Sequence, residues 1–184
     1  NAITGVISTL VARNTVKATS REHVTISVKK ASGSSANDTD PLPGVYIEAH
    51  DNTELLNLAG ALSAAGSVGA GATVVALVFN KTVTAETGKE HKILAPGKVQ
   101  VIADAKDTLW LLAVNFAAGG SAGVAGGANA LVFQNHITSA LGGIVGDARN
   151  SVQSVKVSAN SDSSLYNLAA AAGIGGTAGV TAVA

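Results

Sequence analysis

Alternating hydrophobic and polar positions mark four short segments along the chain. Val45–Ala49, Val99–Ala103, Val155–Ala159 and Thr82–Ala85 each alternate with a period of two and are rich in β-branched residues. This pattern predicts β-strands, because successive side chains in a strand point to opposite faces. We therefore expect a strand at each of these four places.

Long uncharged stretches follow the first two alternating segments, over Leu55–Phe79 and Leu109–Phe133. Gly-rich centres, Gly66–Gly71 and its copies, divide the stretches into two halves of strand length, since glycine inside a strand pattern marks a bend or a close backbone approach. Strands that are buried on both faces read as continuous apolar runs. Each stretch therefore predicts two β-strands joined by a Gly-rich bend.

The same residues recur in the same order along the chain. The interval is 54 residues from Val45 to Val99 and 56 residues from Val99 to Val155. At these intervals the chain also matches Leu58-Ala59 with Leu112-Ala113 and Leu168-Ala169, and Ala76–Phe79 with Ala130–Phe133. Asn14–Ala18, Lys81–Ala85 and Asn135–Ser139 resemble one another. Such repeats are typical of architectures in which each unit stacks on its neighbours.

We predict an all-β fold, a parallel β-solenoid (β-helix) built from tandem repeats of ~54 residues. A single repeat-built domain covers residues 1–184. It consists of a partial repeat 1–44 with the long loop 19–44, the repeats 45–98 and 99–154, and the partial repeat 155–184.

Equivalent residues of such a stack lie above one another. The predicted ladders are Leu55 with Leu109 and Leu165, Leu58 with Leu112 and Leu168, and Phe79 with Phe133. Leu56, Trp110 and Tyr166 share the position next to Leu55. Alternation places these three on the opposite face, where a large ring fits if it reaches the surface.

Polar loops separate the repeats, because insertions in a stacked array grow only on its outer face. The predicted loops are Thr19–Gly44, Glu86–Lys98 and Leu141–Ser154. The first contains Ser32–Pro41, which we expect to be an exposed excursion.

Composition supports a thin core. Aromatic residues make up only 3% of a chain with 21 glycines, so the apolar side chains are mostly Ala, Val and Leu. Cysteine is absent, which removes disulfides, thiolate metal sites and cysteine nucleophiles. Twelve basic and twelve acidic residues balance, so charge does not steer the chain toward nucleic acid or an anionic membrane. Zero net charge with a mean hydropathy of +0.35 favours self-association.

Membrane-spanning helices are the alternative for the uncharged stretches, since about 20 apolar residues can cross a bilayer as a helix. Against a helix, Leu109–Phe133 contains Asn115, Asn129 and two Gly-Gly pairs. Glycine costs a helix roughly 1 kcal/mol relative to alanine. Clusters of Lys or Arg that would anchor a spanning helix do not flank the stretches. We therefore favour strands.

The histidines show no paired spacing of the kind that metal ligands have. They are His23, His50, His91 and His136, and three of them lie in or beside predicted loops. We expect solvated loop histidines and no zinc site.

Three aspartates, Asp51, Asp104 and Asp162, each lie near the entrance to an uncharged stretch. Calcium is one interpretation, but Asp51 and Asp104 are one register apart, and the dense Asp/Gly nonapeptide pattern of calcium-binding β-rolls is missing. We expect turn residues that cap strand ends.

The sequence predicts no catalytic, cofactor-binding or metal-binding residue, and we expect no enzyme. Gly119–Gly123 is rich in glycine, but no Gly-Lys-Ser/Thr follows it, so no phosphate loop is predicted. A nucleophile-elbow motif for Ser-His-Asp catalysis is absent. Charge is sparse and is expected mainly in loops.

The repeat unit resembles a known family. Its first full copy reads I-x-A-x-D at the opening, L-A-x-x-x-x-x-A-G-S-V-G in the middle and V-F-N-K-T-V-T-A at the close. This resembles the repeats of very large filamentous adhesins, the leukotoxin-family and autotransporter-type exoproteins of Gram-negative bacteria. The resemblance covers nearly the whole chain outside Thr19–Gly44. It implies a secreted, surface-attached β-solenoid stalk used in adhesion, and it carries no functional residue onto this chain.

We expect a structural or adhesive surface scaffold module, secreted or on the bacterial cell surface, that stacks end to end in a longer chain or a fibre. Its partners would be copies of itself or adjacent repeats, and a host or surface receptor bound through loops, with Thr19–Gly44 the best candidate. We expect no nucleic acid, cofactor or membrane contact. Two alternatives remain: a membrane-active protein that inserts its Gly/Ala-rich segments, and a carbohydrate-active β-helix with charged side chains converging on one face.

Overall fold

The computed structural model describes residues 1–29, 42–149 and 151–184, which form ten β-strands and no helix. The excursion predicted at Ser32–Pro41 lies outside the described residues. The strands are β1 (Ala2–Thr19), β2 (Thr25–Ser27), β3 (Val45–Ala65), β4 (Val68–Glu86), β5 (Lys92–Leu94), β6 (Lys98–Gly119), β7 (Ala122–Ala140), β8 (Ile144–Val145), β9 (Ser154–Gly175) and β10 (Ala178–Val183).

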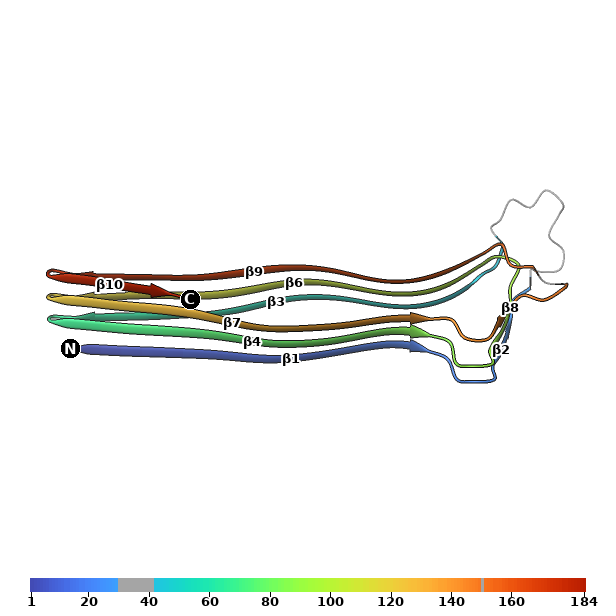
Figure 1. Cartoon of the computed structure of the whole chain (residues 1–184), viewed down its shortest axis with the longest axis horizontal. Helices are drawn as coiled ribbons and strands as arrows, with labels where there is room; N and C mark the ends of the chain where they lie inside the picture. Colours follow the sequence, from blue (N-terminus) through green and yellow to red (C-terminus); the bar gives the residue numbers. More distant parts are fainter. Residues whose placement is uncertain (30–41, 150) are drawn as a thin grey trace.

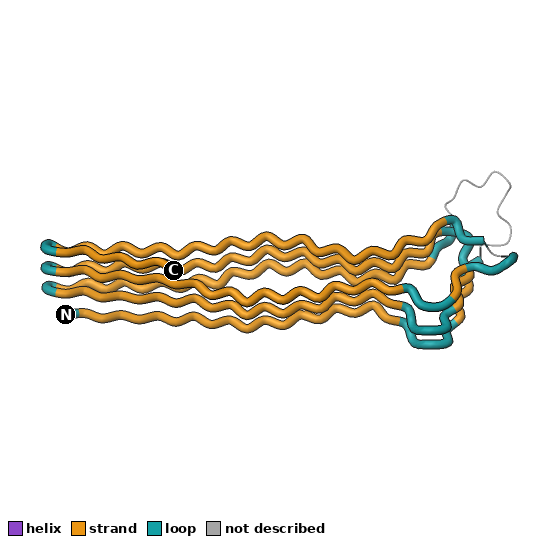
Figure 2. The backbone as a smooth tube through the Cα atoms, viewed as in Figure 1, coloured by secondary structure: helices purple, strands orange, loops and turns teal. Residues whose placement is uncertain are grey.

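The strands form three parallel sheets with the orders β1-β4-β7-β10, β3-β6-β9 and β2-β5-β8. Two long sheets run side by side and meet at tight turns at one end (Figures 1 and 2). Loops and the short third sheet connect them at the other end. Each full coil therefore consists of two long strands and one short strand, and the coils stack as a parallel β-solenoid.

The repeat intervals are the registers of the long sheets. Val45 pairs with Val99 between β3 and β6, and Val99 pairs with Val155 between β6 and β9. All of the predicted ladders are present, including Leu55 with Leu109 and Leu165. The Phe79 and Phe133 rings stack with their centroids 5.7 Å apart.

The long strands extend further than the sequence pattern predicts. The alternating segment Val45–Ala49 and the first half of the uncharged stretch form one strand of 21 residues, β3. Asp51, Asp104 and Asp162 lie inside β3, β6 and β9, so their prediction as turn residues that cap strand ends is wrong. Aspartate is depleted in strands, but pairing with the neighbouring coil overrides that local preference.

The bends between the long strands are the predicted Gly-rich centres, at residues 66–67, 120–121 and 176–177. These turns stack on one another. A Cβ atom at Gly120 would lie 2.1 Å from the carbonyl oxygen of Gly66, and one at Gly176 would lie 2.5 Å from that of Gly120. Only glycine allows the backbone to approach this closely.

The core is thinnest near the bends. A Cβ atom at Gly69 would lie 2.1 Å from the carbonyl oxygen of Ala118 in the opposite sheet, and one at Gly123 would lie equally close to that of Ile174. The core widens along the strands, where Leu77, Phe79, Leu109 and Leu111 are buried with their neighbours. The small-residue composition therefore reflects two sheets that converge toward the turns.

The short sheet was not predicted, because two or three residues are too few to show a period. Its strand β5 buries Ile93 within a third apolar cluster. His91, just before β5, is 1% exposed, so the expectation of a solvated histidine is wrong at this position. Its Nε2 atom lies 2.6 Å from the Arg21 carbonyl oxygen and 3.0 Å from Ser20 Oγ.

The helical alternative for the uncharged stretches is wrong, because Leu55–Phe79 and Leu109–Phe133 consist of strands and bends. Within the described ranges, no helix is long and apolar enough to cross a membrane.

Candidate functional site

A layer of polar side chains crosses the core between two apolar clusters. Phe79 belongs to one cluster and Val83 to the other, and Lys81 lies between them on β4. Because side chains alternate along a strand, Lys81 shares the inward direction of these two residues. Its side chain is completely buried (0% exposed).

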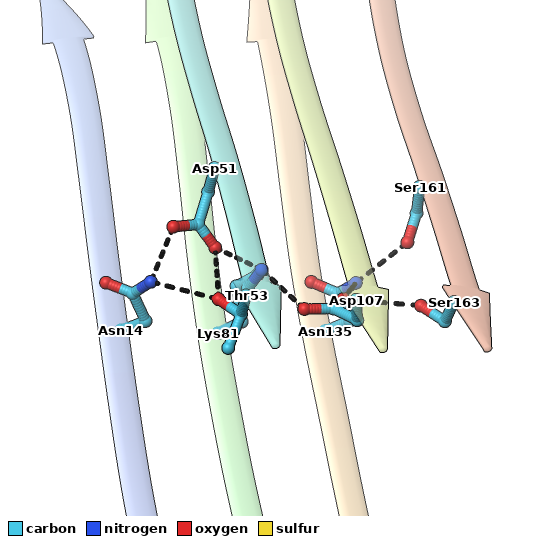
Figure 3. A network of polar contacts seen from close by, with 8 residues as sticks. All are labelled: Asn14, Asp51, Thr53, Lys81, Asp107, Asn135, Ser161 and Ser163. Carbon is cyan, nitrogen blue, oxygen red and sulfur yellow. Dashed lines mark hydrogen bonds and ion pairs between the residues drawn. The ribbon is translucent and has the colours of Figure 1, made fainter. Parts of the chain in front are cut away.

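Two aspartates from the opposite sheet contact this lysine. Lys81 Nζ lies against Asp51 Oδ2 of β3 and 2.5 Å from Asp107 Oδ1 of β6 (Figure 3). The Asp107 side chain is also completely buried, whereas that of Asp51 is 10% exposed. The ion pairs therefore join the two long sheets through the middle of the core.

Neutral side chains complete the contacts of the two carboxylates. Asp51 accepts hydrogen bonds from Asn14 Nδ2 at 2.6 Å and from Thr53 Oγ1 at 2.9 Å. Asp107 Oδ2 accepts hydrogen bonds from Asn135 Nδ2 at 3.2 Å and from Ser163 Oγ at 3.3 Å. We call these four donors together with Lys81, Asp51 and Asp107 the polar layer.

The polar layer is organised by the same ladders as the apolar core. Asn14, Lys81 and Asn135 are consecutive rungs of one ladder in β1, β4 and β7. The lysine is thus the central rung, with an asparagine in the coil on either side. Each asparagine reaches across to one aspartate, so neighbouring coils share the polar contacts.

The charges of the polar layer do not balance. One ammonium and two carboxylates give a net charge of −1 in a region shielded from water. Burial raises the pKa of Asp51, but hydrogen bonds from Lys81, Thr53 and Asn14 and the positive charge of Lys81 lower it below its ordinary value. Asp51 is therefore held as a carboxylate. Replacing a buried ion pair by apolar residues is often neutral or stabilising, so the layer is not explained by stability alone.

The sequence pattern did not predict this layer, because charge was expected mainly in the loops. One signal was available. Lys81 lies two residues from the apolar Phe79 and two from the apolar Val83, and this spacing along a strand predicts an inward side chain. Its partners could not be found in this way, since the repeat fixes the register within each sheet but not which residues face each other across the core.

An open groove of about 600 Å³ lies on the outer face of the β3-β6-β9 sheet, beside the polar layer. His50 Nδ1 lies 3.2 Å from Asp104 Oδ2, and Asn160 Nδ2 donates to Asp104 Oδ1 at 2.7 Å. Asp162 also lines this groove, and Asp51 borders it from the inner side. The three aspartates singled out in the sequence thus lie close to one groove, but their ladder positions differ.

The remaining histidines lie apart from this groove. His23 pairs with Glu90 at the surface, with 2.7 Å between Nδ1 and Oε2. His136 lies on β7, within 3.2 Å of Thr138 Oγ1. Among the residues that the structure describes, no group of three or more His, Cys, Asp or Glu could hold a metal ion. Gly119–Gly123 comprises the last residue of β6, the bend at residues 120–121 and the first two residues of β7.

Both ends of the stack present unpaired strands. Within the described ranges, β1 and β3 have no further partner at one end, and β9 and β10 have none at the other. Leu165 of β9 pairs with the completely buried Leu109 and yet is 45% exposed, and Val157 above Val101 is exposed to the same extent. The core thus continues to the end of the stack without a cover.

Apolar side chains also cover the outer faces of both long sheets. On β3 and β6 they include Leu56, Leu62 and Phe116, and on β1 they include Ile3 and Ile7. The outer rings Trp110 and Tyr166 stack with their centroids 3.9 Å apart.

Comparison of the chain with protein-family models, curated proteins and solved structures gave no match.

Proposed function

We propose that this chain is a structural or adhesive scaffold module that stacks end to end, either with adjacent repeats of a longer chain or with copies of itself in a fibre. The observation that carries the proposal is the open edge at each end of the stack. Unpaired N–H and C=O groups on an edge strand are a template for a further strand. The exposed, inward-facing Leu165 and Val157 supply apolar surface for the same contact.

Geometry supports a continuing stack. The ladder positions of β9 have the same alternation as those of β6, so another coil could lie on β9 as β9 lies on β6. Such a coil would cover the apolar residues of β9 and satisfy its free backbone groups. Repeat proteins grow in this way because each unit contacts only its neighbours.

The resemblance to filamentous adhesin repeats supports a secreted or cell-surface setting. In that setting the stack of coils supplies length and stiffness, and the loops at the end opposite to the Gly-rich bends present binding surfaces. Loop 19–44 remains our candidate for contact with a host or surface receptor.

Assembly can be tested with a charge at the open end. We expect sedimentation velocity to show species that grow with concentration, and electron microscopy to show rods. Leu165→Lys places a charge on the inward face of the edge strand, a device by which natural sheets prevent edge pairing. This variant should shift the distribution to smaller species.

Leu168→Lys is the matched control, because Leu168 lies on the outer face of the same strand and is 55% exposed. It should assemble like the unaltered chain. A stable, dilute monomer with no concentration-dependent growth would contradict a fibre built from copies of this chain. Equal effects of the two lysine substitutions would contradict assembly through the open edge, since the inward face of β9 would then matter no more than the outer face.

A further inference from the structure

Lys81 occupies an environment in which an amine and a carboxyl can react. Its Nζ atom is completely buried and contacts one carboxylate oxygen from β3 and one from β6. The Phe79 ring lies beside it, with 5.6 Å between Nζ and the ring centroid. A buried site with fixed partners holds the reacting groups together, and the exclusion of water strengthens electrostatic effects.

We propose that Lys81 forms an intramolecular isopeptide bond with Asp107, which links the two long sheets through the core. The ammonium of Lys81 and the carboxylate of Asp107 would condense to a neutral amide and one water molecule. The Nζ–Cγ bond forms, and the bond from Cγ to Oδ1 breaks. Two of the three ammonium protons leave with Oδ1 as water, and the third stays on the amide nitrogen.

The two aspartates differ in a way that assigns their roles. Asp51 receives two neutral donors besides Lys81, one on each oxygen, and is held as a carboxylate. It is placed to take a proton from Lys81 Nζ, which frees the nitrogen lone pair for attack, and to pass that proton to Asp107 Oδ1, so that a neutral amine attacks a neutral carboxylic acid. A second proton moves from Nζ to Oδ1 by the same route as Oδ1 leaves as water. Its charge is the same before and after the reaction.

Asp107 has the contacts that an acceptor needs. Its Oδ1 atom faces Lys81, and both of its neutral donors, Asn135 Nδ2 and Ser163 Oγ, converge on Oδ2. Attack at Cγ pushes negative charge onto Oδ2, where these two donors stabilise it. Oδ1 has no neutral donor among the described contacts and is the oxygen free to leave.

Burial favours the product. Two opposite charges in a dry core carry a desolvation penalty, and an amide replaces them with neutral groups. One carboxylate remains, that of Asp51, which is the least buried of the three ionised side chains and borders the outer groove.

The bond can be tested by the intact mass of the denatured chain. The unaltered chain should be lighter than its sequence by one water, and tandem mass spectrometry of a digest should join the peptides that contain Lys81 and Asp107. Lys81→Arg should have the full mass of its sequence. Lys106→Arg, which changes an exposed lysine close by, should still lack one water.

The role of Asp51 as the proton carrier is tested by the rate at which the bond forms. Asp51→Asn should slow the formation of the bond by about a hundredfold, the usual contribution of a general base, when mass is followed with time in chain newly synthesised in vitro. An unchanged rate would contradict the role of Asp51. A folded, unaltered chain with the full sequence mass would overturn the proposal. So would the loss of ammonia, which indicates an asparagine acceptor, or a peptide joined at Asp51.

Discussion

The position of a residue in the inward and outward alternation of its strand decides whether its side chain belongs to the core or to the surface. Leu109 and Leu58 are the same amino acid in neighbouring strands of one sheet, yet Leu109 is 0% exposed and Leu58 is 59% exposed. The first packs among Leu77, Phe79 and Leu111, whereas the second faces outward. Because the strands are long and straight, one residue of register changes a core position into a surface position.

This difference gives a test of the core. Leu109→Ala should lower the free energy of unfolding by about 2–5 kcal/mol, through lost burial and the cavity left behind. Leu58→Ala should change it by no more than about 0.5 kcal/mol. Guanidinium titration followed by circular dichroism measures both. Equal losses would mean that the assignment of inner and outer faces is wrong.

Glycine is required at the bend for a reason that can also be tested. Gly120→Ala would place a methyl group against the Gly66 carbonyl oxygen, and relieving such an overlap costs about 1–3 kcal/mol. Gly5 on β1 has open space where its Cβ would be, so Gly5→Ala should keep stability or raise it by up to about 1 kcal/mol. Thermal unfolding of the two variants separates these outcomes, and a stable Gly120→Ala variant would argue against stacked turns.

Strands of about twenty residues are the elements from which this fold is built. Their ladders could be predicted from the sequence, because a constant repeat interval fixes the register of parallel neighbours. Their length could not, since Asp51 and its neighbours in β3 have low strand propensity and are held in the strand by contacts in adjacent coils. The polar layer depends on the packing of one sheet against the other, which no repeat encodes.

The aromatic pair on the outer face of the β3-β6-β9 sheet reports on strand pairing. Trp110 is the single tryptophan, and its stacking on Tyr166 joins β6 to β9. Tyr166→Ala should expose the indole further and shift its fluorescence emission to longer wavelength. Tyr46→Ala on β3 is the control, because Tyr46 pairs with Gln100, far along the ladder from Trp110. A red shift in the control and none in Tyr166→Ala would contradict this pairing.

The described chain is elongated along its strands, with tight turns at one end and loops at the other, and the first and last coils of its stack have open edges (Figure 1). Its long axis is set by the length of the strands, whereas the stack grows across that axis by one coil at a time. The polar layer ties consecutive coils together, and the apolar outer faces near the Gly-rich bends lack charge. Self-assembly would extend such a stack, and a covalent cross-link within the core would hold its two long sheets together.

All of these conclusions require that residues one repeat apart lie side by side. Spin labels at Val78→Cys and Val132→Cys test this, because the two residues are exposed partners on β4 and β7 and the chain has no other cysteine. Adjacent strands lie about 4.8 Å apart, so the pair should show strong dipolar broadening. Labels at Val78→Cys and Val124→Cys, about 26 Å apart along the strands, should show none. Equal spectra from the two pairs would contradict the parallel, in-register stack.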